Sequence, residues 1–238
     1  TLSAAVARAS GVSSRTVILD SAATLSENTT IQSGVTLQMG SGASLAIESG
    51  VTLTNAGTIT NSGSISVAGT FTSSGTFTNS GDVTVSAGAN CTIGGTFTHS
   101  GDIVVAAGVA PSNGGALTIS TGYTGNGGIT VGARGTADLP NGQQVSDLTV
   151  NGTVSSSALT VTGNATVENG GKLDVDNVTV RGRITNNGEI EATSITVYAG
   201  STLTHESGSL SGTVDVYGTL EVSCTAHGSI DAASDDTS

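Results

Sequence analysis

One cluster of charged residues between positions 174 and 191 has the composition of a catalytic or binding site. Alternation along the flanking strands points its side chains outward, away from the apolar residues between them. Paired carboxylates beside arginines could serve glycoside hydrolysis or polysaccharide cleavage, and carboxylates alone could bind calcium. We favour a salt-paired, solvated face, because tryptophan and the glycine-rich nonapeptide calcium repeat are both absent from the sequence. The cluster comprises Asp174, Asp176, Arg181, Arg183, Glu189 and Glu191, and the side chains that could stack on a sugar are Tyr123, Tyr198 and Tyr217.

The histidines His99, His205 and His227 are scattered and lack the spacing of metal ligands. His99 replaces Asn61 and Asn79 of the neighbouring repeats, which indicates a polar residue in a stack at one corner. We therefore assign no catalytic, cofactor-binding or metal-binding residue, and we expect no cofactor and no enzymatic activity.

Threonine pairs of the form Thr-x-Thr recur at 58/60, 76/78 and 96/98 and would stack on one face. Such ladders resemble those of ice-binding solenoids, although Val104 interrupts the pattern on the adjoining strand. Ordinary strand propensity explains them equally well, because threonine is β-branched and suits a pleated surface. Glycosylation is a further option at the Asn-x-Ser/Thr sequons, which begin at Asn28, Asn90, Asn151, Asn164 and Asn177.

The elements that must position all these residues are set by a repeat between Gly57 and Val105. Glycines recur every six residues from 57 to 81, and one or two alternating apolar residues lie between them. Longer copies begin at 57, 75 and 95, so the larger repeat is 18 and then 20 residues. A short strand motif nested in a longer repeat is the pattern of a solenoid.

The repeat predicts an all-β fold, a parallel β-helix with three short strands per turn of about 18–20 residues. Ile59, Phe77 and Phe97 would lie above one another inside the coil. The alternative is an antiparallel sandwich, which also shows short alternating strands but does not repeat at this length. The loosening from six to seven residues favours a right-handed coil, and the chain length allows roughly ten to twelve turns.

The boundaries of the solenoid follow from where the pattern starts, weakens and stops. Residues 1–15 would form an N-terminal cap or arm, with helical spacing over 2–9. Residues 16–230 would form a single solenoid domain. Irregular, loop-bearing turns are expected at 106–147, where both prolines lie, and residues 231–238 would form an acidic C-terminal tail.

The runs TNSGSISV, FTNSGDVTV, FTHSGDIVV and ITNNGEIEA resemble repeats of filamentous-haemagglutinin-type adhesins and autotransporter passenger domains. This resemblance covers residues 51–105 and 184–192 most closely. It implies a right-handed β-helix exported to the cell surface, and it transfers no functional residue to this chain.

Composition limits the partners and the compartment. The net charge of −12 disfavours nucleic acid and anionic membrane surfaces, and no run of 18 apolar residues predicts membrane insertion. Cys91 and Cys224 lie about seven turns apart, too far for a bridge within the chain, so both are expected to point inward as small apolar residues. An intermolecular bridge is the less favoured alternative.

These observations together predict an extracellular or cell-surface structural protein. We expect it either to assemble end to end into a filament or to form the stalk of an adhesin. The filament form follows from the patterned C-terminal edge, which could pair with the next copy in a head-to-tail homopolymer. The alternatives are a ligand-binding adhesin that recognises a host or polysaccharide surface, an ice-binding surface and, less favoured, a carbohydrate-active enzyme.

Overall fold

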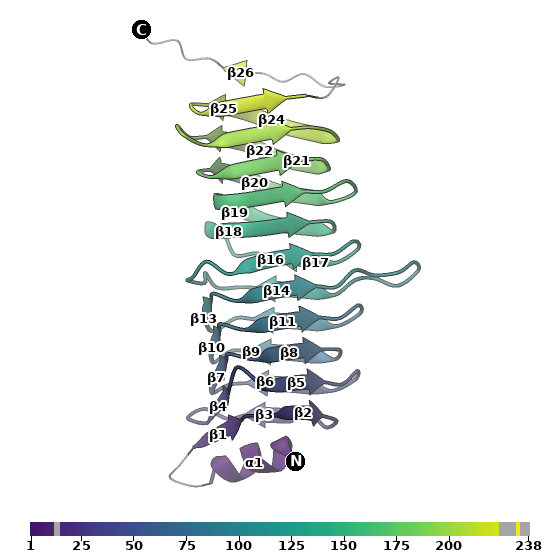
Figure 1. The fold of residues 1–238 in the computed structure, drawn as a ribbon, viewed down its shortest axis with the longest axis vertical. Coiled ribbons are helices and arrows are strands. Elements are labelled where there is room, and N and C mark those ends of the chain that lie inside the picture. Colours follow the sequence, from purple (N-terminus) through teal and green to yellow (C-terminus); the bar gives the residue numbers. More distant parts are fainter. Residues whose placement is uncertain (12–14, 224–231, 234–238) are drawn as a thin grey trace.

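The computed structural model describes residues 1–11, 15–223 and 232–233, and it is a β-solenoid of about 11 turns (Figure 1). Strands account for 58% of the residues that the structure describes and helix for 4%. Every strand pair is parallel, and the apolar residues of each turn face the interior of the coil. Successive turns rise by about one interstrand spacing, 4.8 Å, so the rod is roughly 50 Å long. The solenoid prediction is confirmed, and the sandwich alternative is wrong.

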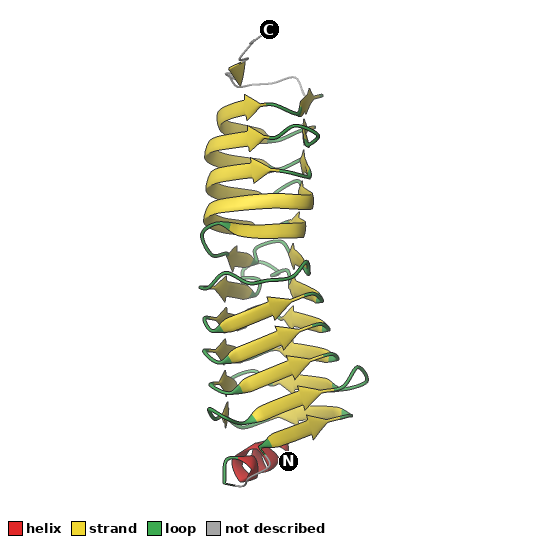
Figure 2. Cartoon of the chain, turned by 90° about the vertical axis from the view of Figure 1, so that its left-hand side faces the viewer, coloured by secondary structure: helices red, strands yellow, loops and turns green. Residues whose placement is uncertain are grey.

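The coil is right-handed. In Figure 1 the near strands, such as β5 and β8, run from left to right while the chain climbs from the N-terminus at the bottom. In Figure 2, which presents the left-hand side, the strands nearest the viewer run toward the face that is in front in Figure 1. The two views together give a path that turns anticlockwise as it rises toward a viewer at the C-terminal end.

Three faces run along the lower turns, and we call them face A, face B and face C in chain order. Face A carries β1 (Thr16–Leu19), β4 (Thr36–Met39), β7 (Thr58–Asn61), β10 (Thr76–Asn79) and β13 (Thr96–His99). Face B carries β2 (Ala22–Leu25), β5 (Ser44–Ile47), β8 (Ser64–Val67), β11 (Asp82–Val85), β14 (Asp102–Val105) and β16 (Gly128–Val131). Face C carries β3 (Thr29–Ile31), β6 (Thr52–Asn55), β9 (Thr70–Ser73), β12 (Asn90–Ile93), β15 (Ala116–Ile119) and β17 (Thr136–Asp138).

The upper turns differ from the expected three short strands, because one long strand covers two or three faces. In the turns of β19, β20 and β22, the bend from face C to face A lacks the glycine of the lower turns and carries pairs such as Asp176-Asn177. Hydrogen bonding therefore continues around the bend, with Asn177 in register with Ser194. The long strands are β18 (Gln143–Val150), β19 (Thr153–Val167), β20 (Lys172–Val180), β22 (Glu189–Val197) and β24 (Ser209–Val216). Face B is completed by the short strands β21 (Arg183–Asn186), β23 (Thr202–His205) and β25 (Thr219–Val222). The last strand, β26 (Ala232–Ala233), pairs with β24.

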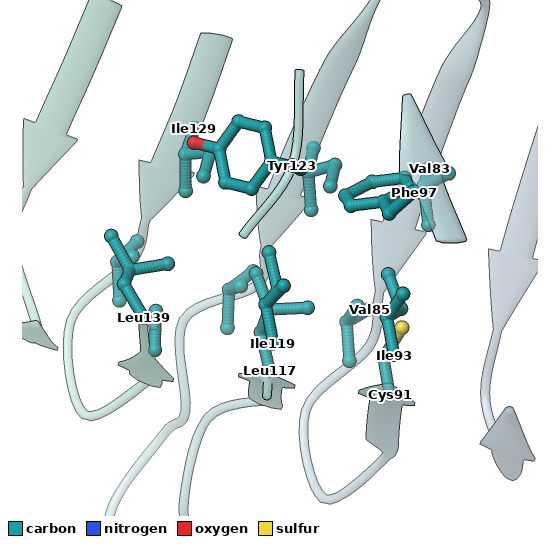
Figure 3. Packing of buried hydrophobic residues seen from close by; sticks show 14 of the residues in the cluster. Val83, Val85, Cys91, Ile93, Phe97, Leu117, Ile119, Tyr123, Ile129 and Leu139 are labelled. Atoms are coloured by element: carbon teal, nitrogen blue, oxygen red, sulfur yellow. The ribbon is translucent and has the colours of Figure 1, made fainter. Parts of the chain in front are cut away.

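Columns of identical or similar side chains fill the interior. Ile59, Phe77 and Phe97 stack as predicted, each at most 2% exposed, and the Phe77 and Phe97 rings lie 5.3 Å apart at an interplanar angle of 13°. Figure 3 shows how this packing continues past Phe97 to Tyr123. Each buried side chain of this size stabilises the fold by about 1.5–3 kcal/mol, but only because the next turn covers it.

Helix α1 (Leu2–Ala9), which matches the helical spacing in the sequence, lies across the N-terminal end of the coil (Figure 1). Its Thr1 cap accepts a hydrogen bond from the Ala4 amide, and its buried Val6 and Ala9 join the core of the coil. The Thr29 hydroxyl of β3 donates to Ser3, 2.9 Å away. The helix therefore covers apolar surface that the first turn would otherwise expose.

Face A is interrupted above β13. The next turn contributes only a single bridge there, from Thr98 to Thr124, before β18 restores the face. The buried Gln143 side chain spans the interruption: its Oε1 accepts from the Tyr123 amide (3.0 Å), and its Nε2 donates to the Tyr123 carbonyl (3.3 Å). A side-chain amide thus takes the hydrogen bonds that a strand backbone would make. The interruption falls inside the region expected to be irregular, and faces B and C continue through it.

Glycines at the bends are required by the closeness of successive turns. Gly57, Gly75 and Gly95 lie in one column, and a Cβ on Gly75 would overlap the carbonyl oxygen of Gly57. The overlapping atom is rigid backbone and cannot rotate away. Gly42, by contrast, has no heavy atom within 4 Å of a built Cβ and does not have a positive φ.

We predict that Gly75→Ala lowers the free energy of unfolding by about 2–3 kcal/mol, because two turns must separate to admit the methyl group. Gly42→Ala is the matched control and should change stability by less than about 1 kcal/mol. Urea unfolding followed by circular dichroism measures both variants. Equal stability of the two variants would contradict the packing described for the bends.

Cys91 points inward as predicted, 1% exposed, and burial raises the pKa of its thiol to about 12. Cys224 lies outside the described residues. In a Cys224→Ser background we expect iodoacetamide to modify Cys91 in denaturant but not in the native protein, because the thiolate is the reactive form. Mass spectrometry measures the modification, and native labelling at the denatured rate would refute the inward orientation.

Candidate functional site

The charged cluster divides into two groups in the structure. All six predicted side chains point outward, as expected. The carboxylates Asp174, Glu189 and Glu191 lie on face C, and Asp176 lies at the bend from face C to face A. Arg181 lies at the bend from face A to face B, and Arg183 directly after that bend begins β21 on face B. The sequence cluster is therefore not a single site that combines acids and arginines, which removes the basis of the less favoured lyase-like alternative.

A lysine that sequence reasoning missed lies among the carboxylates of face C. Lys172 is in register with Glu189, and its Nζ lies 3.4 Å from Glu189 Oε1 and 3.9 Å from Asp174 Oδ2. It also hydrogen bonds to Glu191, and this contact raises the pKa of the Lys172 ammonium. The sequence contained a clue to this contact, because Lys172 precedes Glu189 by 17 residues, which is the length of one turn here.

This ion cluster connects two turns but lacks the features of a catalytic or metal site. The carboxylates are about half exposed, so water screens the ion pairs and each contributes little stability. Lys172 already occupies the space between the carboxylates, and the salt-paired interpretation is confirmed for these residues. Over residues 1–11 and 15–223, no three His, Cys, Asp or Glu side chains are grouped as metal ligands.

The bend between faces A and B carries Arg181 and two tyrosines, and Arg183 follows directly after the bend. Arg181, Tyr198 and Tyr217 follow one another on successive turns, since each donates its amide to the carbonyl of the last face A residue of the turn below. The Arg181 guanidinium lies over the Tyr198 ring, 4.2 Å from its centroid. Tyr198 is 40% exposed and Tyr217 is 66% exposed. Sequence reasoning noted these residues separately, but only the register between turns shows that they are neighbours.

The histidine of the corner stack is buried inside the coil. Asn61 Nδ2 donates to Asn79 Oδ1 (2.7 Å), and Asn79 Nδ2 lies 3.4 Å from His99 Nδ1. His99 Nδ1 thus accepts while its Nε2 donates to the Gly128 carbonyl (3.1 Å), an arrangement that fits the neutral ring. The predicted stack is confirmed. Burial lowers the pKa of His99, and the Gly128 hydrogen bond and Asp102 oppose this shift.

A second asparagine–histidine pair occupies face B higher in the coil. Asn186 Nδ2 lies 3.0 Å from His205 Nδ1, and burial lowers the pKa of His205 as well. Both histidines therefore serve the interior rather than a surface site. His227, the third histidine, lies outside the described residues.

A cleft of about 400 Å³ opens beside the interruption of face A. It has peptide groups, amides and a hydroxyl on its walls and no charged side chain, so it offers no general acid or base at neutral pH. The hydroxyl of buried Tyr123 has no hydrogen-bond partner, and burial raises the pKa of that hydroxyl. The lining residues are Gly122, Tyr123, Thr124, Gly125, Asn141, Gly142, Gln143 and Gln144.

Threonine columns form on more than one face. The three predicted Thr-x-Thr pairs are in register on face A. Val104 does interrupt face B, but that face then continues with a longer column that sequence reasoning missed, because the repeat there is hidden by variable turn lengths. Its members are Thr130, Thr149, Thr166, Thr185 and Thr204. Threonine on several faces favours strand propensity over one specialised ice-binding plane.

Comparisons with known proteins point to one family. The Haemagglutinin repeat model matches residues 1–81 and 184–235, together more than half of the chain. A search of curated proteins found no match. Among solved structures, a TibA fragment hyper-glycosylated by TibC is 20% identical in sequence. That match covers 91% of this chain and 94% of the fragment with a TM-score of 0.24, a value that supports no further argument.

Helix α1 is too short and too polar to cross a bilayer, and the described residues contain no other helix.

The sequons beginning at Asn28, Asn90, Asn151, Asn164 and Asn177 all have asparagines that are exposed or half-exposed. Their glycosylation stays a prediction.

We predict that stability falls as the pH drops below about 6.5, the ordinary histidine pKa. A lowered folded-state pKa means that the unfolded chain binds the proton more readily, so acid favours unfolding. His99→Asn, which installs the residue found at 61 and 79, should reduce the slope of unfolding free energy between pH 7 and pH 5. Adding His205→Asn should reduce it further.

Urea unfolding at a series of pH values measures this slope, which is independent of any constant loss of stability in the variants. An unchanged slope in the double variant would show that the two histidines do not titrate differently on unfolding.

Proposed function

The chain belongs to the haemagglutinin repeat family, and on this premise we propose that it forms the rod-shaped stalk of an extracellular, cell-surface adhesin. The observation that carries the proposal is the parallel ladder that continues on faces B and C from the first turn to β25. Such a ladder makes a stiff rod whose length is set only by the number of turns. We propose a structural role and no catalytic one.

The stalk accounts for the N-terminal end better than an end-to-end filament does. In a head-to-tail polymer, the last turn of one copy would add to the strand edge of the next. Here α1 lies over that end, with Val6 and Ala9 packed on the core, so an incoming strand would have to displace the helix. The filament therefore becomes the alternative outcome of the experiment.

We expect negative-stain electron microscopy and sedimentation equilibrium of the purified chain to show single rods at all concentrations. Deletion of α1 provides the informative variant, because it uncovers the first turn and should promote association. Fibres that lengthen with concentration in the intact chain would contradict the stalk and support the filament.

A stalk made of equivalent turns should also tolerate the removal of one turn. Deleting residues 58–75 joins Gly57 to Thr76, which is in register with Thr58 in the intact chain. We expect a folded rod that is shorter by about 4.8 Å. X-ray scattering measures the length, and circular dichroism measures the fold.

Deleting residues 58–66 is the control for this experiment. It leaves Val67 directly after Gly57 and places Gly69 within a strand position, so the variant should lose stability. If both deletions unfold the chain equally, the turns are not interchangeable, and the proposal of a modular spacer fails.

A further inference from the structure

The bend between faces A and B is the one described place where exposed aromatic rings and arginines adjoin. Arg181, Tyr198 and Tyr217 occupy equivalent positions on successive turns, and Arg183 follows two residues after Arg181. Adjacent turns are spaced by about 4.8 Å, so the four side chains form one narrow strip. We call this strip the arginine–tyrosine strip.

The positive charge of the strip is uncompensated. Lys172 has three carboxylates within 4 Å, whereas Arg181 and Arg183 have none among the residues that the structure describes. The chain has only six lysines and arginines against 18 acidic residues, and Arg181 and Arg183 are the only two of the six that lie within two residues of each other. An unpaired surface arginine presents its N–H groups to water, where a carboxylate could replace the water.

The contact of Arg181 with Tyr198 holds the guanidinium group over the ring. The Arg181 Cζ lies 4.2 Å from the Tyr198 ring centroid, and the arginine side chain is exposed, so N–H donors remain accessible beside the ring. The N–H donors of a guanidinium match the two oxygens of a carboxylate. Tyr217, the most exposed aromatic ring described, adds a flat apolar surface one turn further along.

We propose that the arginine–tyrosine strip binds an acidic saccharide, with Arg181 and Arg183 holding carboxylates and Tyr217 stacking on a pyranose ring. A sugar with a carboxylate needs both features at once: charge-assisted donors for the acid and an aromatic face for the C–H groups of the ring. The site is independent of the stalk proposal, since a monomeric rod and a filament would both expose it.

The probe is oligogalacturonate, a chain of uronic acid residues, titrated calorimetrically into the full chain at low salt. Its methyl ester, which keeps the rings but not the charges, is the matched ligand and should bind at least about tenfold more weakly. We expect Arg181→Ala/Arg183→Ala to weaken oligogalacturonate binding about tenfold or more and to reduce its salt dependence. Tyr217→Ala should weaken binding about fivefold without changing the salt dependence.

Two further variants distinguish binding at a specific site from non-specific electrostatic attraction to the protein. Arg181→Lys keeps the charge but loses the planar fork, so it should weaken binding by about threefold or more. Arg8→Ala removes an exposed arginine from α1, at the far end of the rod, and should leave the affinity unchanged. Circular dichroism verifies that each variant is folded, which is expected because every substituted side chain is exposed.

The proposal is overturned if the intact chain binds neither ligand, or if it binds the ester as tightly as the acid. It is also overturned if Arg8→Ala lowers the affinity as much as Arg181→Ala/Arg183→Ala does, since binding would then depend on the total positive charge of the protein and not on the arginine–tyrosine strip.

Discussion

The structure depends on the parallel hydrogen bonding of each turn to the one below, at a spacing of about 4.8 Å. This spacing places equivalent residues in contact, so one position in the sequence becomes a column in the molecule. The columns favour side chains that pack well on copies of themselves, such as the Phe77–Phe97 stack and the threonines of face B. They also force unfavourable neighbours together, since Asp82 and Asp102 are adjacent on face B.

Polar residues can enter the interior because the same columns provide their partners. Asn61 reaches Asn79, and Asn79 reaches His99, so in this column each side chain finds a hydrogen-bond partner on the next turn. A buried amide without a partner would cost about 1–3 kcal/mol. Histidine replaces asparagine in this column because Gly127 leaves room for the ring and Gly128 supplies a carbonyl acceptor.

Much of the fold could be predicted from residues that repeat, and the surface arrangement could not. The glycines at 57, 75 and 95 fix the turn length locally, and they correctly predicted the coil and the Ile59–Phe77–Phe97 column. The grouping of Lys172 with Glu189, or of Arg181 with Tyr198, depends on the exact number of residues in irregular turns. Those lengths follow from how bends such as Asp176-Asn177 are built, which glycine spacing does not reveal.

The replacement of a strand by the Gln143 amide has a consequence for how the rod bears load. At that level face A is held by one side chain and a single bridge, while faces B and C keep their full ladders. Tension along the axis therefore meets its least resistance at this interruption, and the turns should bend or separate there first. A tether built in this way would first separate at the interruption, while the turns below and above it stay folded, and those turns would unfold only afterwards.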